Sequence, residues 1–303
     1  MQIFDTLKKT EYKTSLALGF FDGVHLGHQN VIKTAVKNAH GHCKSAVLTF
    51  KKSPSATLNK ACKPMLSTNE EKFRLFEKLG VEIVFCIDFE EICHLSAQEF
   101  VKTVLCDTLN AEFASVGFNY HFGKGGTATA DDLVAMCKKL CIKSQMCVPV
   151  TYKGEAVSST RIRECIQNGE IEDANAMLGY EFAVSGEIKS GNHIGTKISS
   201  PTINQPLNPE VITPKFGVYA TKVTIDCKTY IGATNIGVHP TVGECSPVCE
   251  THLLDFSGGN LYSLDATTRL IHFIRPEQNF SSLSDLKDQI EKDKLQILSY
   301  LQK

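Results

Sequence analysis

The chain has 303 residues, of which 42% are hydrophobic and 21% charged, and its formal net charge is −1. This composition is typical of a globular protein with about two domains of ordinary size. The balanced charge argues against a basic surface for nucleic acid or an anionic membrane, and no apolar run approaches the length of a membrane span.

The N-terminus, Met1–Asp5, lacks the basic and then apolar layout of a signal peptide. We therefore expect a cytoplasmic protein whose partners are small-molecule substrates, with no nucleic acid and no membrane among them. The sequence assigns no oligomeric state.

The twelve cysteines are scattered and form no C-x-x-C pair, the nearest pairs being Cys137/Cys141 and Cys245/Cys249. Zinc ribbons require the closer spacing. Cys86 lies in the apolar segment Val81–Ile87, where cysteine packs as a small hydrophobic residue. We expect buried free thiols in preference to a metal site or a disulfide framework.

The first 150 residues alternate short apolar segments with helical patterns. Strands are predicted at Ser15–Gly19, Ser45–Phe50, Val81–Ile87, Phe113–Phe118 and Gln145–Val150. Strands separated by helices predict an α/β domain, a Rossmann-like parallel sheet with right-handed crossovers and helices on both faces. In such sheets ligands bind beyond the carboxyl ends of the strands.

Several of the intervening helices have readable ends. The residues 67–70 and 96–99 both read Ser-x-x-Glu, which predicts two capping boxes. Gly41 and Gly80 follow periodic helices and are expected at the position after the C-cap. A further helix is predicted over Asp131–Leu140.

The first strand leads into the segment Gly19-Phe20-Phe21-Asp22-Gly23-Val24-His25-Leu26-Gly27-His28. Helical spacing of apolar residues from Val31 to Ala39 follows, so this segment is a turn from a strand into a helix. Its glycines keep the backbone approachable, and a helix N-terminus favours phosphate. His25 and His28 can donate hydrogen bonds to a phosphoryl group under attack. The segment predicts phosphate chemistry in preference to a plain tight turn with surface histidines.

Two later loops are expected at the same edge of the sheet. In Gly117–Gly126, glycines and aromatic residues surround Asn119, which suits either a nucleotide contact or a flexible surface loop. In Ser158–Arg163, hydroxyl side chains cap a helix that stops near Gly169. Capping does not explain Arg161 in the first helical turn, where the helix dipole disfavours a cation, so an anion is expected beside it.

A helix over Glu170–Leu178 ends at Gly179, and we place the domain boundary there, giving domains 1–180 and 181–303. The second domain shows strand patterns at Phe182–Ile188, Val218–Ile225, Thr229–Ile236, Thr251–Phe256 and Thr268–Ile274. Strands without intervening helices predict a small antiparallel barrel. An amphipathic helix over Leu283–Leu301 closes the chain.

The barrel carries its own chemical candidates. Pro201–Asn204 offers a hydroxyl and an amide just after a turn without strand character, a donor set suited to a metal–phosphate cluster. Glu250 stands at the entry of an alternating strand and can serve as general base for an alcohol. From the residues alone, ordinary structural roles are equally compatible with both segments.

Taken together, these motifs resemble the prokaryotic bifunctional riboflavin kinase/FAD synthetase family over essentially the whole chain. The matching segments are 19–28, 158–163, 201–204, 217–220, 235–241 and 250–256. The resemblance implies a nucleotidyltransferase domain followed by a six-stranded riboflavin kinase barrel with a C-terminal helix. It also implies the substrates ATP, riboflavin and FMN, with Mg²⁺ as cofactor.

Carried over by motif, the N-terminal domain would join the AMP part of ATP to FMN and release pyrophosphate. His25 and His28 would stabilise the α-phosphate in the transition state, as catalytic residues together with Arg161. The nucleotide and the leaving pyrophosphate would be held by Gly19, Phe20, Asp22, Gly23, Asn119, Ser159, Thr160 and Arg161.

In the C-terminal domain the resemblance implies that Glu250 takes the proton of the ribityl 5′-hydroxyl of riboflavin. Thr202 and Asn204 would hold Mg²⁺ and the phosphates of ATP. Arg275 falls in the region of the family's flavin-side loop and would contact flavin.

The sequence departs from the family pattern at three places. Residues 50–54 read Phe-Lys-Lys-Ser-Pro where the family has Phe-Asp-Pro-His-Pro, and in the glycine-rich loop Gly126 and Ala128 replace an arginine and a glycine. Residues 195–204 lack the arginine, one glycine and the aromatic residue of the kinase motif. Four readings follow: the two-step enzyme, a monofunctional FMN adenylyltransferase, an adenylyltransferase for another phosphorylated acceptor, or a flavin-binding regulator with a decayed kinase domain.

Overall fold

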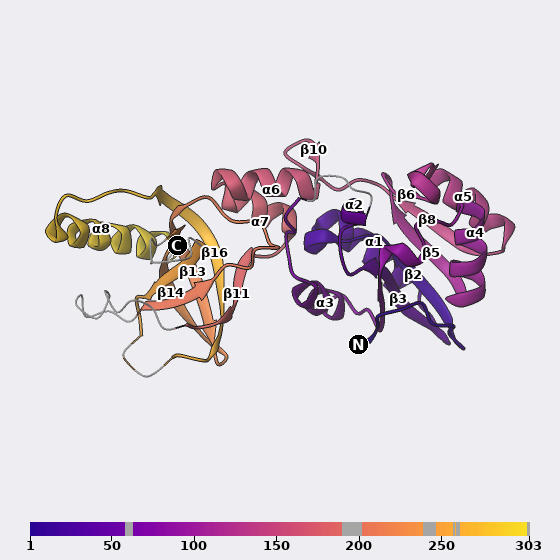
Figure 1. The fold of residues 1–303 in the computed structure, drawn as a ribbon, viewed down its shortest axis with the longest axis horizontal. Helices are drawn as coiled ribbons and strands as arrows, with labels where there is room; N and C mark the ends of the chain where they lie inside the picture. Colours follow the sequence, from indigo (N-terminus) through magenta and orange to yellow (C-terminus); the bar gives the residue numbers. More distant parts are fainter. Residues whose placement is uncertain (58–62, 190–201, 239–246, 257, 259–260, 302–303) are drawn as a thin grey trace. The chain divides into compact units, whose positions relative to one another are not determined.

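The computed structural model describes residues 1–57, 63–189, 202–238, 247–256, 258 and 261–301 (Figure 1). The chain divides into two compact units, Met1–Ser159 and Thr160–Lys303. The expected functional boundary at residue 180 stays a prediction.

The N-terminal unit is built on a parallel sheet with the strand order β1-β4-β3-β2-β5-β8, which confirms the expected α/β fold. Its strands are β1 (Gln2–Phe4), β2 (Lys13–Leu18), β3 (Cys43–Phe50), β4 (Ile83–Ile87), β5 (Ala111–Gly117) and β8 (Lys143–Cys147). The short strand β1 was not foreseen, because three residues are too few to show a periodic pattern.

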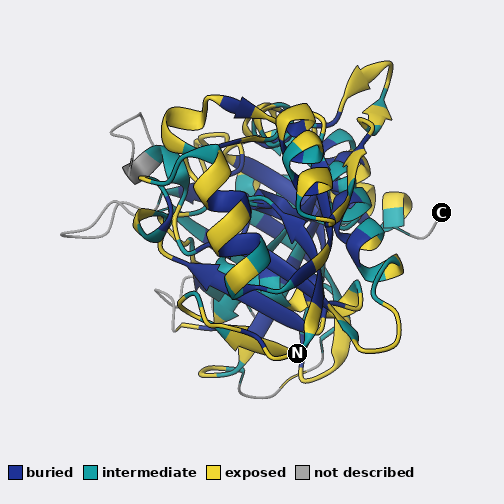
Figure 2. Cartoon of the chain, turned by 90° about the vertical axis from the view of Figure 1, so that its right-hand side faces the viewer, coloured by how far each residue is buried: buried dark blue, intermediate teal, exposed yellow. Residues whose placement is uncertain are grey.

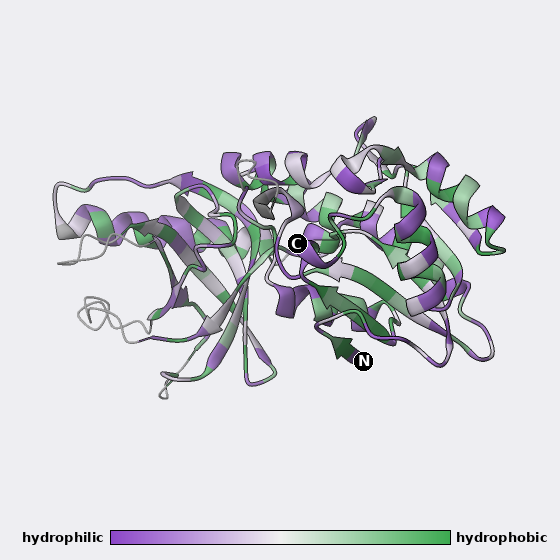
Figure 3. Cartoon of the chain, turned by 45° about the vertical axis from the view of Figure 1, so that its right-hand side comes forward, coloured by the Kyte–Doolittle hydropathy of each residue, from purple (hydrophilic) through white to green (hydrophobic). Residues whose placement is uncertain are grey.

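Helices cover both faces of this sheet. They are α1 (Leu26–Lys37), α2 (Pro54–Thr57), α3 (Asn69–Lys78), α4 (Ala97–Glu99), which continues as a π-helix over Phe100–Thr108, and α5 (Ala130–Lys139). Because side chains alternate along a strand, Leu16 faces one apolar core and Ala17 the other. The central strands β2 to β5 are largely dark blue in Figure 2 and largely green in Figure 3, whereas the helices show mixed faces. Two small hairpins, β6 (His121–Phe122) with β7 (Ala128–Thr129) and β9 (Thr151–Tyr152) with β10 (Glu155–Ala156), complete the unit.

The helix ends agree with the sequence in part. The capping box of Ser96 and Glu99 is confirmed, and Gly80 follows the C-cap of α3 with φ 87°. The box expected at 67–70 is wrong by one residue, because the capping pair is Thr68 with Glu71. The prediction that Gly41 directly follows a C-cap is also wrong, because α1 ends at Lys37 and its C-cap is Asn38.

The strand order indicates which edge of the sheet is expected to bind a ligand. From β2 the chain moves outward through β3 to β4, and β5 then returns to the other side of β2. The carboxyl ends of β2 and β5 are therefore neighbours from which the chain leaves in opposite directions, the arrangement at which open α/β sheets bind ligands. The segment Gly19–His28, called the histidine turn below, leaves β2 at this point, and the loop with Asn119 leaves β5.

The C-terminal unit contains an antiparallel six-stranded sheet in the order β11-β16-β13-β14-β15-β12, as expected for a barrel. The strands are β11 (Ala183–Glu187), β12 (Thr202–Pro206), β13 (Gly217–Ile225), β14 (Lys228–Val238), β15 (Pro247–Leu253) and β16 (Asp265–Pro276). The backbone N–H of Lys189 donates to the carbonyl of Asn204 at 2.8 Å, which links the chain after β11 to β12 and nearly closes the barrel.

The interior of the barrel contains a polar chain. The hydroxyls of Thr221, Thr234 and Thr251 are joined by hydrogen bonds of 2.7 and 2.8 Å, and all three residues are fully buried. Thr268 donates to the Oε1 of buried Gln205 at 2.6 Å. Because these groups are partnered inside the barrel, their burial costs little free energy.

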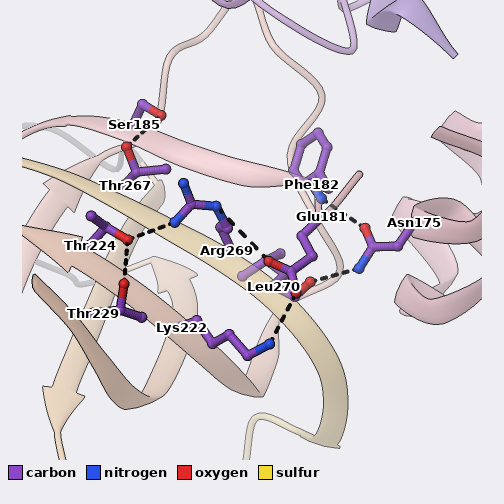
Figure 4. Close-up of polar contacts among 10 residues, drawn as sticks. All are labelled: Asn175, Glu181, Phe182, Ser185, Lys222, Thr224, Thr229, Thr267, Arg269 and Leu270. Atoms are coloured by element: carbon purple, nitrogen blue, oxygen red, sulfur yellow. Dashed lines mark hydrogen bonds and ion pairs between the residues drawn. The ribbon is translucent and has the colours of Figure 1, made fainter. Parts of the chain in front are cut away.

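The described part of this unit has the helices α6 (Ser159–Asn168), which starts at the boundary of the two units, α7 (Ile171–Leu178) and α8 (Leu283–Leu301). The side chain of Asn175 in α7 donates to the carbonyl of Leu270 at 2.9 Å and accepts from the N–H of Phe182 at 2.7 Å (Figure 4). Asn175 thereby fastens α7 to β16 and to the start of β11. On the other side, α8 packs against β13, β14 and β16.

Candidate active sites

The histidine turn has a strained backbone. Phe21, Gly23 and Val24 all have positive φ angles, of 55°, 73° and 36°. A Cβ on Gly23 would lie 2.7 Å from the side chain of Leu66, so glycine is required there. The backbone N–H of Leu66 also donates to Asp22 Oδ1 at 2.8 Å and anchors the turn. Strain of this kind persists at functional sites where the surroundings fix it.

His25 and His28 stack on each other with a ring-centroid distance of 3.6 Å. The backbone N–H of His28 donates to Nδ1 of His25 at 3.3 Å, so His25 serves as the N-cap of α1. This acceptor role leaves the proton of a neutral His25 on Nε2. The two histidines are thus held at the N-terminus of α1, and the Nε2–H of His25 is left as a hydrogen-bond donor.

Both histidines are uncharged at neutral pH. Burial lowers the pKa of His25 to about 4. Burial also lowers the pKa of His28 well below its usual value, and electrostatic interactions with His25 and Lys72 lower it further. The Nδ1 of His28 is buried and has no hydrogen-bond partner among the residues that the structure describes. The two imidazoles are therefore suited to donate hydrogen bonds, while positive charge must come from other groups.

The sequence analysis missed Lys72, which is only 2% exposed and lies in α3 behind the histidine turn. Its Nζ is 3.4 Å from the carbonyl oxygen of Phe20 and 4.8 Å from the centroid of the Phe20 ring. A signal was present, since Lys72 and Phe76 share the buried side of an amphipathic helix. Lysine is almost never fully buried unless it is paired, so a lysine on the apolar face of a helix indicates a role other than core packing.

The other predicted nucleotide residues fall in different places. Ser159 donates to the backbone carbonyl of Asp22 at 3.0 Å and so lies against the histidine turn. Asn119 follows β5, the neighbour of β2, and its carbonyl contacts His121 Nδ1 at 3.0 Å. Thr160 and Arg161 continue α6 in the second unit, and their roles stay predictions.

The unusual loop after β3 is held by its own contacts. Lys51, which replaces the acidic residue of the family pattern, forms an ion pair with Asp88 at 2.7 Å. The carbonyl of Lys51 accepts a hydrogen bond from the Asn69 side chain at 2.9 Å. In this chain the loop is therefore tied to the residues after β4 and to the start of α3.

In the barrel, strand register brings three polar residues into one row. Glu250 of β15 is the direct partner of Asn204 in β12 on one side and of Asn235 in β14 on the other. Paired residues of antiparallel strands share a face, and the neighbours Ile203, Thr251 and Thr234 are buried inside the barrel. The row of Asn204, Glu250 and Asn235, called the Glu250 row below, therefore lies on the outer face.

This arrangement corrects one expectation, because Glu250 lies inside β15 and not at its entry. Thr202 and Asn204 lie in strand β12, and the turn expected before them falls outside the described residues. Thr202 pairs with His252, so its hydroxyl is on the same outer face as the Glu250 row. Asn235, which opens one of the family motifs, was not among the predicted site residues, and strand register places it beside Glu250.

The expected position of Arg275 in a loop is wrong, because it lies in strand β16. Its guanidinium forms a nearly buried ion pair with Asp293 of α8, with Nη2 to Oδ2 at 2.7 Å and Nε to Oδ1 at 3.0 Å. Nη1 donates to the carbonyl of Pro276 at 3.1 Å. These contacts fasten α8 to the barrel, and a flavin contact of Arg275 stays a prediction.

The donor set fits a magnesium–phosphate site better than a protein-only metal cage. Within the described ranges no cluster of three histidine, cysteine or acidic side chains is able to hold a metal ion. Mg²⁺ usually binds through one or two protein oxygens together with substrate phosphates and water. Thr202 and Asn204 offer such oxygens on one face of β12. The motif residues 195–201 and 239–241 lie outside the described residues.

All cysteines that the structure describes are free thiols, and Cys86 is buried in β4 as its apolar segment predicts. Among the described residues, no helix is both long enough and apolar enough to span a bilayer.

Comparison with known proteins matches both units. The family model of FAD synthetase matches residues 7–161, and that of riboflavin kinase matches residues 178–301. The chain is 36% identical to the bifunctional riboflavin kinase/FMN adenylyltransferase of Bacillus subtilis (strain 168), over 97% of this chain and 94% of that protein. The protein of the same name from Escherichia coli (strain K12) is 32% identical, over 92% and 90% of the two chains.

A solved structure shows the same fold along the whole chain. The crystal structure of a macrolide-efflux protein from Streptococcus pneumoniae has a TM-score of 0.87 and 28% sequence identity, and the match covers 97% of this chain and 98% of that one. With both family models matched in order and near full-length relatives above 30% identity, the chain belongs to the family of bifunctional riboflavin kinase/FMN adenylyltransferases.

Proposed function

We propose that this chain makes both flavin cofactors: the barrel unit phosphorylates riboflavin to FMN with ATP, and the sheet unit adenylylates FMN to FAD with release of pyrophosphate. The observation that carries this proposal is that each unit holds its own assembled group of motif residues. The stacked pair His25/His28 stands at the ligand edge of the sheet, and Glu250 stands between two asparagines on the barrel.

In the adenylylation step, a phosphate oxygen of FMN attacks the α-phosphorus of ATP. The new P–O bond forms as the bond to the bridging oxygen breaks, and pyrophosphate leaves with its electron pair. His25 and His28 donate hydrogen bonds to the oxygens of the α-phosphate, where negative charge shifts during the reaction. Neutral donors fit this role because they need no desolvation of a cation, and the N-terminus of α1 adds positive potential.

The remaining motif residues of this site bind the nucleotide. Gly19, Phe20, Asp22 and Gly23 shape the turn so that the backbone approaches the phosphates, and Asn119 contacts the nucleotide from the neighbouring loop. Ser159, Thr160 and Arg161 hold the leaving pyrophosphate, for which the guanidinium fork of arginine is well matched. Most of the rate acceleration then comes from positioning and electrostatics.

In the kinase step, Glu250 accepts the proton of the ribityl 5′-hydroxyl of riboflavin, and the hydroxyl oxygen attacks the γ-phosphorus of ATP. The bond between the γ-phosphorus and the bridging oxygen breaks, and ADP leaves. The asparagines of the Glu250 row flank the carboxylate and orient the reacting groups. Thr202 and Asn204 would hold Mg²⁺, which neutralises phosphate charge when bound.

Retention of the Glu250 row favours the two-step enzyme over a regulator with a decayed kinase. Flavin binding alone needs no carboxylate held in register with Asn204. Arg275 supports the same site through its ion pair to α8, and a direct flavin contact is proposed for the part of its surface that remains exposed.

The test is a time course of the full chain with riboflavin and Mg²⁺-ATP, followed by chromatography of FMN and FAD. We expect FMN to appear first and FAD to follow, with pyrophosphate released in step with FAD. FAD formed only when FMN is supplied would reduce the proposal to an adenylyltransferase. Flavin binding without either product would favour the regulator.

A further inference from the structure

Lys72 is a buried cation whose ammonium group lies among backbone carbonyl and hydroxyl oxygens. Its Nζ is 3.3 Å from the carbonyl oxygen of Phe50, 3.4 Å from that of Phe20 and 3.5 Å from Thr49 Oγ1. None of the carboxylates in the described part of the chain forms an ion pair with it. Burial of an ammonium group is costly unless a counter-charge compensates it, so stability alone does not account for this lysine.

The oxygens around Lys72 belong to the ligand edge of the sheet. Phe20 enters the strained histidine turn, and Phe50 ends the neighbouring strand β3. Thr49 also donates to the carbonyl of Phe20, at 2.9 Å. The ammonium thus ties together the ends of β2 and β3, directly before the turn that carries both histidines.

The titratable groups around this ammonium leave its charge in place. Asp22 faces it from the turn, and the Asp22 carboxylate already accepts the N–H of Leu66 at 2.8 Å. Cys86 faces it from β4, and burial raises the pKa of that thiol so that it stays neutral. His28 faces it from α1 and is neutral, with a pKa that the charge of Lys72 lowers further. Burial lowers the pKa of Lys72 to about 8, so it is mostly charged at neutral pH.

We propose that Lys72 is a positioning residue of the adenylyltransferase site, a buried cation that fixes the Phe20 carbonyl at the entry to the histidine turn and attracts the polyphosphate of ATP to it. This inference rests on the proposed function, because it takes the histidine turn as the place where ATP binds. An arriving polyphosphate brings negative charge to Lys72, which forms no ion pair among the described residues. The attraction between the ammonium and bound ATP then offsets the free-energy cost of burying the charge.

The first experiment compares Lys72→Met with Lys72→Arg in FAD synthesis from FMN by the full chain. We expect Lys72→Met to raise the KM for ATP about tenfold with a smaller change in kcat, since a lost charge weakens ground-state binding. Lys72→Arg should stay within about threefold of the unaltered chain. Lys78→Met is the matched control, because Lys78 is exposed on the same helix.

Folding is checked in the same samples. Methionine fills a similar volume without a charge to desolvate, so we expect Lys72→Met to keep or raise the melting temperature. Riboflavin phosphorylation by the barrel unit should be unchanged in all three variants. An unchanged KM for ATP in Lys72→Met would overturn the proposal.

A second measurement uses the unaltered chain, so its main result does not depend on whether a variant folds. Deprotonation of Lys72 removes the attraction for ATP, so the KM for ATP should rise in the unaltered chain between about pH 7 and pH 9. In Lys72→Arg this rise should be absent, because arginine keeps its charge. A KM for ATP that stays flat in the unaltered chain would contradict the role of Lys72.

A third measurement separates this inference from the proposed function. In the ligand-free chain followed by NMR, His28 should titrate at higher pH in Lys72→Met than in the unaltered chain, because a neighbouring positive charge has been removed. This readout requires no catalysis. Absence of FAD synthesis in the unaltered chain would contradict the proposed function, while an unshifted His28 titration would overturn the inference itself.

Discussion

The histidine turn and the Glu250 row hold their side chains on two different kinds of backbone. The histidine turn is a loop with three positive φ angles, anchored by Asp22 and by the buried ammonium of Lys72. The Glu250 row is fixed by antiparallel register, which needs no unusual dihedral angle. A loop lets backbone N–H groups approach phosphates closely, whereas a rigid strand holds a carboxylate at a set distance from its neighbours.

The histidine turn and the Glu250 row also differ in the polarity of their surroundings. The histidine turn packs against the apolar core of the sheet, where burying an unpartnered polar group costs free energy. Burial lowers the pKa values of both His25 and Lys72. The barrel has a hydrogen-bonded threonine chain inside and carries its site on the outer face. Substitutions that change charge should therefore alter the activity of the sheet unit more strongly than that of the barrel unit.

The largest expected effect separates the two activities. Glu250→Gln should lower riboflavin phosphorylation by about 10²–10⁴-fold, because the amide cannot accept the proton of the 5′-hydroxyl. FAD synthesis from supplied FMN should remain. Glu210→Gln, at an exposed position of the same unit, is the control and should leave both rates unchanged. Equal loss of both activities in Glu250→Gln would contradict the assignment of one site to each unit.

The reciprocal change is His28→Asn. It removes one donor to the α-phosphate, so FAD synthesis should fall by about 10²–10³-fold while riboflavin phosphorylation continues. His40→Asn serves as the control, because His40 follows α1 and is exposed. Both rates are measured by chromatography of FMN and FAD. Retention of full FAD synthesis in His28→Asn would remove the histidine pair from the mechanism.

The pH dependence of stability should report the buried imidazoles. The pKa of His25 is about 4 in the folded chain against an ordinary value of 6.5, so below pH 6.5 the unfolded chain binds a proton that the folded chain does not. Stability is therefore lost as the pH falls from 6.5 to about 4, by up to about 3 kcal/mol.

Denaturant unfolding of the full chain at a series of pH values measures this loss. His25→Asn should flatten the curve in that window, since asparagine does not titrate and can still cap α1. A curve with the same slope in His25→Asn would show that other groups cause the acid sensitivity.

The smallest predicted effect tests the corrected capping box. Thr68→Ala should destabilise α3 by about 1 kcal/mol, because the hydroxyl that caps the N–H of Glu71 is lost. Ser67→Ala is the matched control, since the buried Ser67 hydroxyl has no hydrogen-bond partner among the described residues. Because α3 carries Lys72, the KM for ATP in FAD synthesis should rise slightly in Thr68→Ala only. A larger loss of stability in Ser67→Ala would restore the sequence-based assignment.

Local patterns predicted most of the longer strands and helices of both units, but not β1 or β12. Apolar runs followed by helical spacing located β2 with α1, and the Ser96–Glu99 box marked α4, because these features depend only on residues close in the sequence. The choice between Ser67 and Thr68 as N-cap was not decided locally. Both are hydroxyl residues followed three positions later by glutamate, and only the packing of α3 selects one.

The sequence by itself determined the two kinds of domain and their order, since these are carried by short-range spacing and ordered motifs, and it predicted the site residues. The tertiary structure alone decided which distant residues meet: Glu250 between Asn204 and Asn235, Arg275 on Asp293, and Lys72 behind the histidine turn. Strand register and helix docking are set by burial of whole faces, which no local pattern encodes. The helical spacing places Lys72 on the same face as Phe76, but only the fold decides that this face is buried against the histidine turn.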